Sequence, residues 1–247
     1  MEMPTAENPV VVHQGDCLDL LRRLPDGCVD AVITDPPYGV GYEAGGKPAG
    51  PATRTLGHVA WDSIIGDDEV RTEWLTEAFR VLRPGSALYL CCRWDVEPEW
   101  RAGLVAAGFT VKQRLTWHKR VGGKGDLTGT YAPTVEDVLF ATKGRHELNH
   151  RPPSLLDVGC VPTWEFRYHP HQKPVELPAL LIKASTQPGD VVLDPFAGSG
   201  TTGLACLRWD RRFIGCELDP THYATAVRRL DHASGTGKGS LFAGATN

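Results

Sequence analysis

The chain has 247 residues, of which 41% are hydrophobic, and this suits a single α/β domain with a sizeable buried core. Its formal net charge of −4 at pH 7 argues against a protein coated in basic residues for nucleic acid. No apolar run approaches the length of a membrane span, and the first eight residues carry two acids and no apolar core, so we expect no signal peptide and a cytoplasmic location.

Short apolar runs alternate along the chain with segments of helical spacing, a pattern typical of a parallel sheet with crossover helices. Strands are predicted at 10–12, 30–34, 87–90, 109–117, 134–142, 191–193 and 212–216. Helices are predicted at 17–24, 69–82, 96–107, 178–185, 201–209 and 221–230, the second ended by Arg83-Pro84-Gly85. The sequence therefore predicts a mostly parallel, seven-stranded sheet with helices on both faces.

Three segments do not follow this alternation. Residues 39–66 are rich in Gly and Pro and too long for a simple connection, so we expect a mobile active-site loop. Residues 143–173 are polar, basic and interrupted by proline. Residues 233–247 are Gly, Ser, Ala and Thr-rich, and we expect a disordered tail after one domain at 1–232.

Positive charge is concentrated in one part of the chain. Residues 110–151 hold eight Lys and Arg against four Asp and Glu. Such a local excess is what a face that follows DNA phosphates needs, although an ordinary solvated surface explains it equally well. The candidate DNA contacts are Lys119, Arg120, Lys124, Arg145 and Arg151.

The seven cysteines include no C-x-x-C pair, and most of them flank apolar runs. We therefore expect buried free thiols in a reducing compartment, with neither disulfides nor a metal site.

One candidate catalytic motif, Asp35-Pro36-Pro37-Tyr38, directly follows the strand predicted at 30–34. Two prolines fix φ and remove both N–H donors, so the turn is stiff and presents carbonyl acceptors. Asp35 adds a carboxylate and Tyr38 a flat ring, which suits an amino group on a planar heterocycle taken out of its stack. A simple strand-ending turn is the alternative.

A second motif, Asp194-Pro195-Phe196-Ala197-Gly198-Ser199-Gly200-Thr201-Thr202, joins a strand to a helix. Its glycines let the backbone approach a ligand, and the helix directs free N–H groups at it. Glu217 ends the next strand, where a carboxylate accepts hydrogen bonds from ribose hydroxyls. The same pattern matches G-x-G-x-x-G, so an NAD-dependent oxidoreductase stays a competing interpretation.

Together these motifs resemble the DNA amino-methyltransferases (N6-adenine and N4-cytosine) in which the catalytic motif precedes the cofactor motif, the beta-class order. The resemblance extends from Val10 to Leu230 and includes Gly15-Asp16-Cys17 and His171-Gln172-Lys173-Pro174. It implies a Rossmann-like, S-adenosylmethionine-dependent methyltransferase fold with circularly permuted motif order.

The resemblance also implies residue roles. Asp35 and the Pro36 carbonyl would take the amino hydrogens of the base, beside Pro37, and Tyr38 would stack on the flipped base. Glu217 would hold the cofactor's ribose, Asp16 its adenine, and Lys173 would lie near its methionine end. The full set expected to bind the cofactor is Asp16, Cys17, Lys173, Asp194, Pro195, Phe196, Gly198, Ser199, Gly200, Thr201, Thr202 and Glu217.

Asp at the first position of the tetrapeptide favours adenine N6 over cytosine N4, for which the family usually has Ser. Many relatives carry a long target-recognition region, but here only residues 143–173 are available for it. Recognition is then compact or shared with a second subunit, and the expected partners are double-stranded DNA, a second copy in a homodimer and a cognate restriction nuclease. RNA or protein methylation and a non-catalytic binding module are weaker alternatives.

Overall fold

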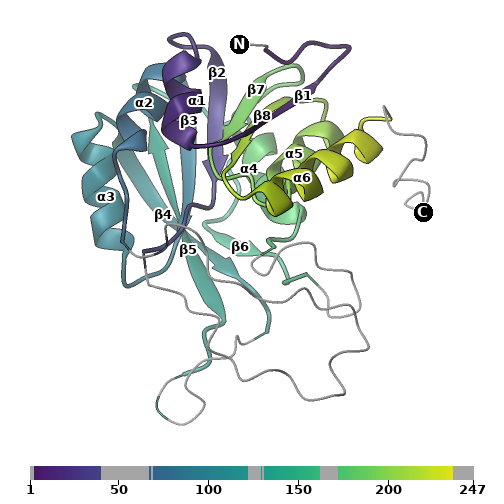
Figure 1. The fold of residues 1–247 in the computed structure, drawn as a ribbon. Coiled ribbons are helices and arrows are strands. Elements are labelled where there is room, and N and C mark those ends of the chain that lie inside the picture. The colour runs from purple at the N-terminus through teal and green to yellow at the C-terminus, as the bar shows by residue number, and fades with distance from the viewer. Residues whose placement is uncertain are drawn as a thin grey trace, which may run out of the picture.

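The computed structural model describes residues 3–39, 67, 69–121, 129, 131–161 and 172–235, and within them eight strands form one sheet (Figure 1). The strands are β1 (Val10–Gln14), β2 (Val29–Thr34), β3 (Leu82–Cys92), β4 (Thr110–His118), β5 (Val135–Thr142), β6 (Leu155–Asp157), β7 (Val191–Asp194) and β8 (Arg212–Glu217). Their order is β1-β8-β7-β2-β3-β5-β4-β6. Only β5 is antiparallel to its two neighbours, so the prediction of a mostly parallel sheet is confirmed.

The sheet has one strand more than the seven predicted. All seven predicted strands are present, and the eighth is β6, which pairs in parallel with β4 at the edge of the sheet. β6 has three residues, too few to give a periodic pattern, so it was not recognised within the polar segment 143–173.

β3 also begins earlier than predicted. The predicted helix 69–82 is shorter, α2 (Trp74–Val81), and Arg83-Pro84-Gly85 belongs to β3 rather than to a turn before it. The register with β2 jumps from the pair Val29–Leu82 to the pair Ala31–Ala87. Proline is tolerated in a strand at such a bulge, because no ladder hydrogen bond is needed there.

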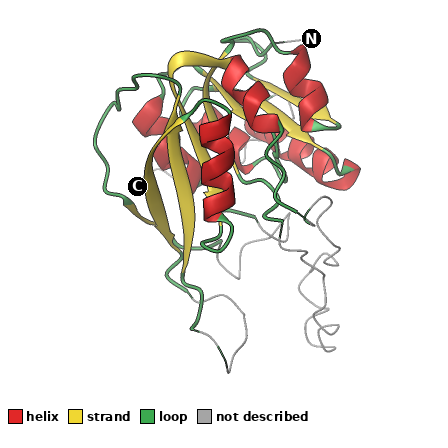
Figure 2. Ribbon diagram, turned by 90° about the vertical axis from the view of Figure 1, so that its left-hand side faces the viewer, coloured by secondary structure: helices red, strands yellow, loops and turns green. Residues whose placement is uncertain are grey.

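Helices cover both faces of the sheet, as predicted (Figure 1). Three of them, α1 (Cys17–Arg23), α2 and α3 (Glu97–Ala106), pack on one face through Leu20, Leu75 and Trp100. The other three, α4 (Glu176–Ser185), α5 (Thr201–Arg208) and α6 (Pro220–Ala233), cover the opposite face. Successive strand residues alternate between the two layers, as Val32 and Ile33 do, and the sheet between them is twisted (Figure 2).

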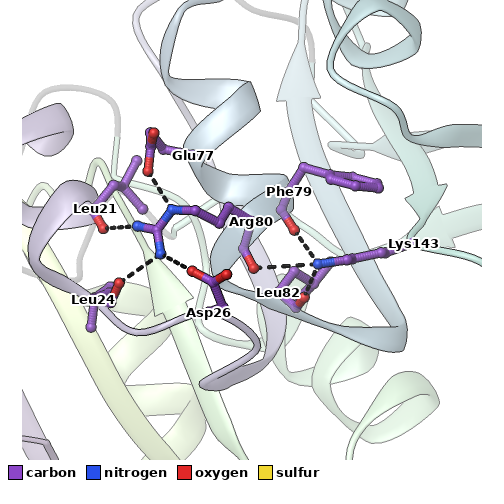
Figure 3. A network of polar contacts seen from close by, with 8 residues as sticks. All are labelled: Leu21, Leu24, Asp26, Glu77, Phe79, Arg80, Leu82 and Lys143. Carbon is purple, nitrogen blue, oxygen red and sulfur yellow. Dashed lines mark hydrogen bonds and ion pairs between the residues drawn. The ribbon is translucent and has the colours of Figure 1, made fainter.

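Two basic side chains donate hydrogen bonds to carbonyls at the C-terminal ends of helices on the first face (Figure 3). Arg80 donates to the carbonyls of Leu21 (2.7 Å) and Leu24 (2.9 Å) at the end of α1. Lys143 donates to the carbonyls of Phe79 and Leu82, both at 2.7 Å, at the end of α2. Because the last carbonyls of a helix have no partner inside it, these cations satisfy them and tie α1, α2 and β5 together.

Several predicted segments lie wholly or partly outside the described residues. These are the loop 39–66 apart from Gly39, residues 162–171 of the recognition segment, and residues 236–247 of the tail. The beginning of the predicted tail is helical, because α6 continues to Ala233.

The cysteines are free thiols, and burial raises the pKa of Cys91 and Cys206 well above the usual value, which keeps both protonated. Over the residues that the structure covers, no group of three or more His, Cys, Asp or Glu side chains is placed to hold a metal ion. None of the helices described is long and apolar enough to cross a bilayer.

The order of the strands creates a crevice between β2 and β7. These strands are parallel neighbours, but β2 continues to α2 on one face and β7 continues to α5 on the other. In an open α/β sheet, ligands bind beyond the carboxyl ends of two such strands, because their connections diverge there. The fold therefore predicts a binding site where Asp35 and Asp194 stand.

Candidate active site

The two motifs lie at the same edge of the sheet, at this divergence. β2 is paired with β7 through Ala31–Val192 and Val32–Leu193, so the residues that follow both strands start side by side. The last residue of β2, Thr34, donates its hydroxyl to Asp194 at 2.8 Å. Asp35-Pro36-Pro37-Tyr38 and the glycine turn thus begin side by side at one edge of the sheet, as the expected chemistry requires.

Asp194 connects the two motifs through hydrogen bonds. It is 3% exposed, and its carboxylate accepts hydrogen bonds from Thr34, Thr202 (2.7 Å) and the Phe196 amide (3.1 Å). Burial raises the pKa of Asp194 to about 6, despite these donors. Asp194 was predicted to line the cofactor, and the structure places its oxygens on protein donors that hold the loop.

The glycine turn needs left-handed backbone at two positions. Gly198 and Gly200 have φ of 52° and 80°, and a Cβ at Gly200 would lie 3.1 Å from Leu230. Arg229 donates to the Ser199 carbonyl and, at 2.9 Å, to its hydroxyl, so a buried guanidinium on α6 holds the turn from behind. The sequence did not mark Arg229 as a site residue, because it is 30 residues from the turn that it supports.

Within this segment, burial distinguishes residues that hold the turn from those that face the crevice. Pro195, Ser199, Gly200, Thr201 and Thr202 are buried. Phe196 and Gly198 are partly exposed, and the Phe196 ring packs edge-on against Trp74 at 5.2 Å between centroids. A ligand can therefore reach Phe196 and the Gly198 backbone, while the other side chains shape the turn.

Glu217, at the end of β8, is fixed beside that turn. Its two carboxylate oxygens accept the Gly198 amide at 2.8 Å and the Asp219 amide at 2.9 Å. Burial raises the pKa of Glu217 above its usual value. The next residue, Leu218, leaves 47% of its surface exposed, an apolar side chain next to an anchored carboxylate.

The neighbouring strand β1 brings Gly15, Asp16 and Cys17 to the same edge. The Gly15 amide donates to the Glu217 carbonyl at 3.0 Å, and Asp16 caps α1 by accepting the Leu18 amide at 2.8 Å. Burial raises the pKa of Cys17 to about 12, so it presents a neutral thiol.

These residues fit the S-adenosylmethionine that the sequence predicts. Glu217 and Asp16 supply carboxylates for ribose hydroxyls and for an exocyclic amine, while Leu218 and Phe196 supply apolar surface for a flat ring. These acceptors suit an adenosine better than a bare phosphate, because Glu217 and Asp16 are carboxylates and the Arg229 guanidinium is already bound to Ser199.

On the other side of the crevice, Asp35, Tyr38 and Lys173 are in direct contact. The Lys173 ammonium lies 2.7 Å from one Asp35 oxygen, and the Tyr38 hydroxyl donates to the other at 2.8 Å. Lys173 also donates to the Tyr38 hydroxyl at 3.1 Å and lies over the rings of Tyr38 and Trp117, 5.4 and 5.6 Å from their centroids. Lys173 was predicted near the methionine end of the cofactor, and the structure places its ammonium on the Asp35 carboxylate.

Glu136 completes this group, and the sequence did not single it out. Its oxygens lie 3.2 Å from the Lys173 ammonium and 3.1 Å from that of Lys119. The residues Asp35, Tyr38, Lys119, Glu136 and Lys173 are called the catalytic cluster below. Because β5 is antiparallel to its neighbours, its first residues, and not its last, lie at this edge.

Charge pairing decides the ionisation of the cluster. Burial raises the pKa of Glu136, but the ammonium groups of Lys173 and Lys119 outweigh burial and hold that pKa below its usual value. Burial lowers the pKa of Lys173, but Asp35 and Glu136 outweigh it in the opposite direction. Burial together with Asp35 and Glu136 raises the pKa of Tyr38, which therefore stays a neutral donor.

The predicted DNA contacts are distributed differently. The Lys119 side chain is only 11% exposed and belongs to the catalytic cluster rather than to an open basic face. Arg120 pairs with Asp157, and Arg145, 89% exposed, pairs with Glu147. Arg151 is exposed, and Lys124 lies outside the described residues.

Solved structures of two proteins are similar over almost the whole chain. The structure of the M1.HpyAVI–SAM complex gives a TM-score of 0.66 and 26% identity, covering 90% of this chain and 100% of that one. The cytosine-N4-specific PvuII DNA methyltransferase gives a TM-score of 0.72, covering 92% of this chain and 87% of that one, and at 19% identity it shows the fold alone. The predicted methyltransferase fold is confirmed.

Comparisons of sequence identify the family. The chain is 33% identical to YubD of Escherichia coli (strain K12), over 88% of each chain. It is 30% identical to the DNA adenine methyltransferase YhdJ of the same organism, over 92% of this chain and 84% of YhdJ. A sequence profile described as DNA methylase, for the N6 and N4 methyltransferases, matches residues 29–228. The chain therefore belongs to this DNA methylase family.

Proposed function

We propose that this DNA methyltransferase transfers the methyl group of S-adenosylmethionine to the N6 amino group of adenine in double-stranded DNA. Methylation of DNA and use of this cofactor follow from the family. The choice of adenine and the roles of individual residues are the proposal. One observation carries it: the Asp35 carboxylate, held by Tyr38 and Lys173, lies at the same edge of the sheet as the glycine turn that follows β7.

In the proposed reaction, the two hydrogens of the base's amino group bind to Asp35 and to the Pro36 carbonyl. An ionised carboxylate offers about four lone-pair sites, so Asp35 can accept from the base while it accepts from Tyr38 and Lys173. Both acceptors draw the hydrogens to one side, which directs the nitrogen's lone pair across the crevice. Asp35 then takes the proton that the methylated nitrogen loses.

When bound, S-adenosylmethionine supplies the methyl group on a sulfonium, and a neutral thioether leaves. Glu217, Asp16 and Leu218 would hold its adenosine at the ends of β8 and β1. The Gly198–Gly200 turn would let its methionine portion pass close to the backbone and toward Asp35. Tyr38 would stack on the target base, which must leave the duplex to reach this crevice.

Two features support adenine over cytosine. The tetrapeptide begins with Asp35, as the resemblance predicts for adenine enzymes, and YhdJ is named a DNA adenine methyltransferase. Both bases offer an exocyclic amino group in the major groove, so hydrogen-bonding chemistry alone does not separate them. Cytosine N4 is the alternative outcome of the test.

DNA contacts by Arg120, Arg145 and Arg151, a homodimer and a cognate restriction nuclease remain predictions. So does the division into a domain at 1–232 with a compact recognition segment at 143–173. The exposed arginines are each paired with an acid or lie on the surface, where phosphate contact and simple solvation are both compatible with their positions.

The deciding experiment identifies the modified nucleoside. The protein is incubated with cofactor carrying an isotopically labelled methyl group and DNA of mixed sequence, and the DNA is digested to nucleosides for mass spectrometry. We expect label in N6-methyladenine. Label in N4-methylcytosine would replace the proposed base. If a parallel incubation with RNA gives labelled RNA while the DNA stays unlabelled, the proposed substrate is overturned.

A further inference from the structure

The catalytic cluster contains a second carboxylate to which the reaction described above gives no role. Glu136 lies at the start of β5, and its neighbours come from separate parts of the chain: Lys119 follows β4, Lys173 precedes α4, and Asp35 and Tyr38 follow β2. We propose that Glu136 is a positioning residue for methyl transfer, which holds Lys173 on Asp35 and balances the charge around the target nitrogen. This inference rests on the proposed function.

The contacts give Glu136 three partners and no free oxygen. One oxygen binds Lys119 at 3.1 Å, and the other binds Lys173 at 3.2 Å and the Tyr38 hydroxyl at 3.3 Å. Lys173 and Tyr38 are the same two groups that hold Asp35. Glu136 thus shares Lys173 with Asp35 and lies beside Tyr38, whose one hydroxyl hydrogen is donated to Asp35 at the shorter distance.

The cluster is electrically balanced and poorly solvated. Its two carboxylates and two ammonium groups sum to zero, and Tyr38 is neutral. The side chains of Lys119, Lys173, Glu136 and Asp35 are 11%, 14%, 20% and 27% exposed, so water screens their charges only partly. Among the residues that the structure describes, Cys91 on β3 also interacts electrostatically with Glu136, as a protonated thiol.

This balance matters because the target nitrogen gains positive charge as the new bond forms. Without the Glu136 charge, two ammonium groups would face a single carboxylate, and the net positive charge would oppose that change. Among the described residues, Lys173 would also keep only Asp35 as a carboxylate partner. The Lys173 ammonium would then compete with the base for the lone pairs of the Asp35 carboxylate. Both effects slow the chemical step, and neither requires Glu136 to touch the base or the cofactor.

The central test compares Glu136→Gln with Asp137→Asn. Asp137 is the next residue of β5. It pairs with Arg114 instead of a lysine of the cluster, and its other charged neighbour is Glu97 of α3. We expect Glu136→Gln to lower kcat at least about tenfold, with KM for S-adenosylmethionine and calorimetric affinity for it within about twofold of wild type. Asp137→Asn should leave kcat within about twofold. A Glu136→Gln enzyme with wild-type kcat, or with a loss confined to KM, would overturn the inference.

A double variant separates charge balance from a merely structural ion pair. Adding Lys119→Met to Glu136→Gln removes one charge of each sign and returns the cluster to neutrality. We expect the double variant to be at least about threefold faster in kcat than Glu136→Gln alone, because neighbouring groups that act together give non-additive effects. If the two substitutions together are slower than Glu136→Gln alone, charge balance is not the reason for the loss.

A third measurement does not depend on activity. With ¹³C-labelled glutamate side chains, NMR titration follows the Glu136 carboxyl in the free protein, and Glu136→Gln assigns its signal. Lys119→Met removes one of the two cations that hold its pKa down, so the signal should titrate at a higher pH than in wild type. An unchanged titration would show that Lys119 does not pair with Glu136 in the protein, and the catalytic cluster as defined would be wrong. If instead wild type methylates no DNA while this shift is present, the proposed function has failed and the contacts of Glu136 stand.

Discussion

The two sides of the crevice are held by different kinds of interaction. On the cofactor side, Asp194 and Glu217 accept hydrogen bonds from backbone amides and hydroxyls, and Asp194 is 3% exposed. On the catalytic side, ion pairs between side chains hold Asp35, and the charged groups are 11–27% exposed. Short hydrogen bonds to backbone fix a shape, whereas a set of paired charges also fixes an electrostatic potential. Substitutions on the cofactor side should therefore change affinity and stability, and those on the catalytic side should change rate.

The largest effect is expected at Asp35, on the catalytic side. Asp35→Ala removes the proposed acceptor of the amino hydrogens and of the released proton, and it leaves Lys173 with Glu136 as its carboxylate partner. We expect kcat to fall by about a thousandfold or more, while the calorimetric affinity for S-adenosylmethionine changes less than about threefold. Circular dichroism checks that the variant is folded. Methyl transfer at the wild-type rate would show that another group accepts the hydrogens.

The next effect concerns stability on the cofactor side and depends on pH. Burial raises the pKa of Asp194 from 3.8 to about 6, so the folded protein binds a proton more tightly than the unfolded chain. The stability that this proton contributes is fully present below pH 3.8 and is lost as pH rises through about 6. Relative to Asp194→Asn, the unfolding free energy of wild type should fall by about 2 kcal/mol between pH 4 and pH 7, measured by urea denaturation.

A control for this pH dependence is Asp157, whose pKa is lowered through its hydrogen bond with Arg120. Asp157→Asn should keep the same decline as wild type over this range, because Asp194 is intact. If Asp194→Asn shows the wild-type dependence on pH, the Asp194 carboxyl is not the group that titrates.

The same contrast explains how far the sequence could predict the site. The glycine turn of the cofactor side lies within a continuous run of nine residues that begins at the end of β7, so it could be predicted from glycine spacing alone. The catalytic cluster is assembled from four segments, of which only Asp35-Pro36-Pro37-Tyr38 forms a recognisable motif. Glu136 is an acid near the start of a largely apolar strand, a pattern that could have suggested a site residue. The sequence would have placed Glu136 at the same edge of the sheet as Asp35 only if β5 had been known to be antiparallel.

Parts of the fold were hidden from the sequence for similar reasons. The seven longer strands could be predicted from short apolar runs, such as 87–90 and 191–193, or from alternation of apolar and polar residues, as at 109–117 and 134–142. β6 could not be, because its pairing with β4 at Thr116–His118 depends on where another strand lies. Arg229 supports the glycine turn from α6, and nothing near Ser199 in the sequence indicates that contact.

The smallest effect is expected at Glu217, where the cofactor side meets its ligand. Glu217→Ala removes the acceptor proposed for the ribose hydroxyls and leaves the amides of Gly198 and Asp219 without this partner. The turn would therefore lose both the proposed ligand contact and a support. A hydrogen bond to a charged group contributes about 1.5–3 kcal/mol, so the affinity for S-adenosylmethionine, measured by calorimetry, should weaken about tenfold to a hundredfold. At saturating cofactor, kcat should stay within about threefold of wild type. Glu217→Gln keeps one acceptor for a backbone amide and should lose less, while Glu176→Ala, which breaks only an exposed pair with Arg208, should bind like wild type. If Glu217→Ala lowered kcat and left the affinity for S-adenosylmethionine unchanged, the Glu217 carboxylate would act in the chemical step. The proposed difference, in which the cofactor side controls affinity and the catalytic side controls rate, would then be wrong.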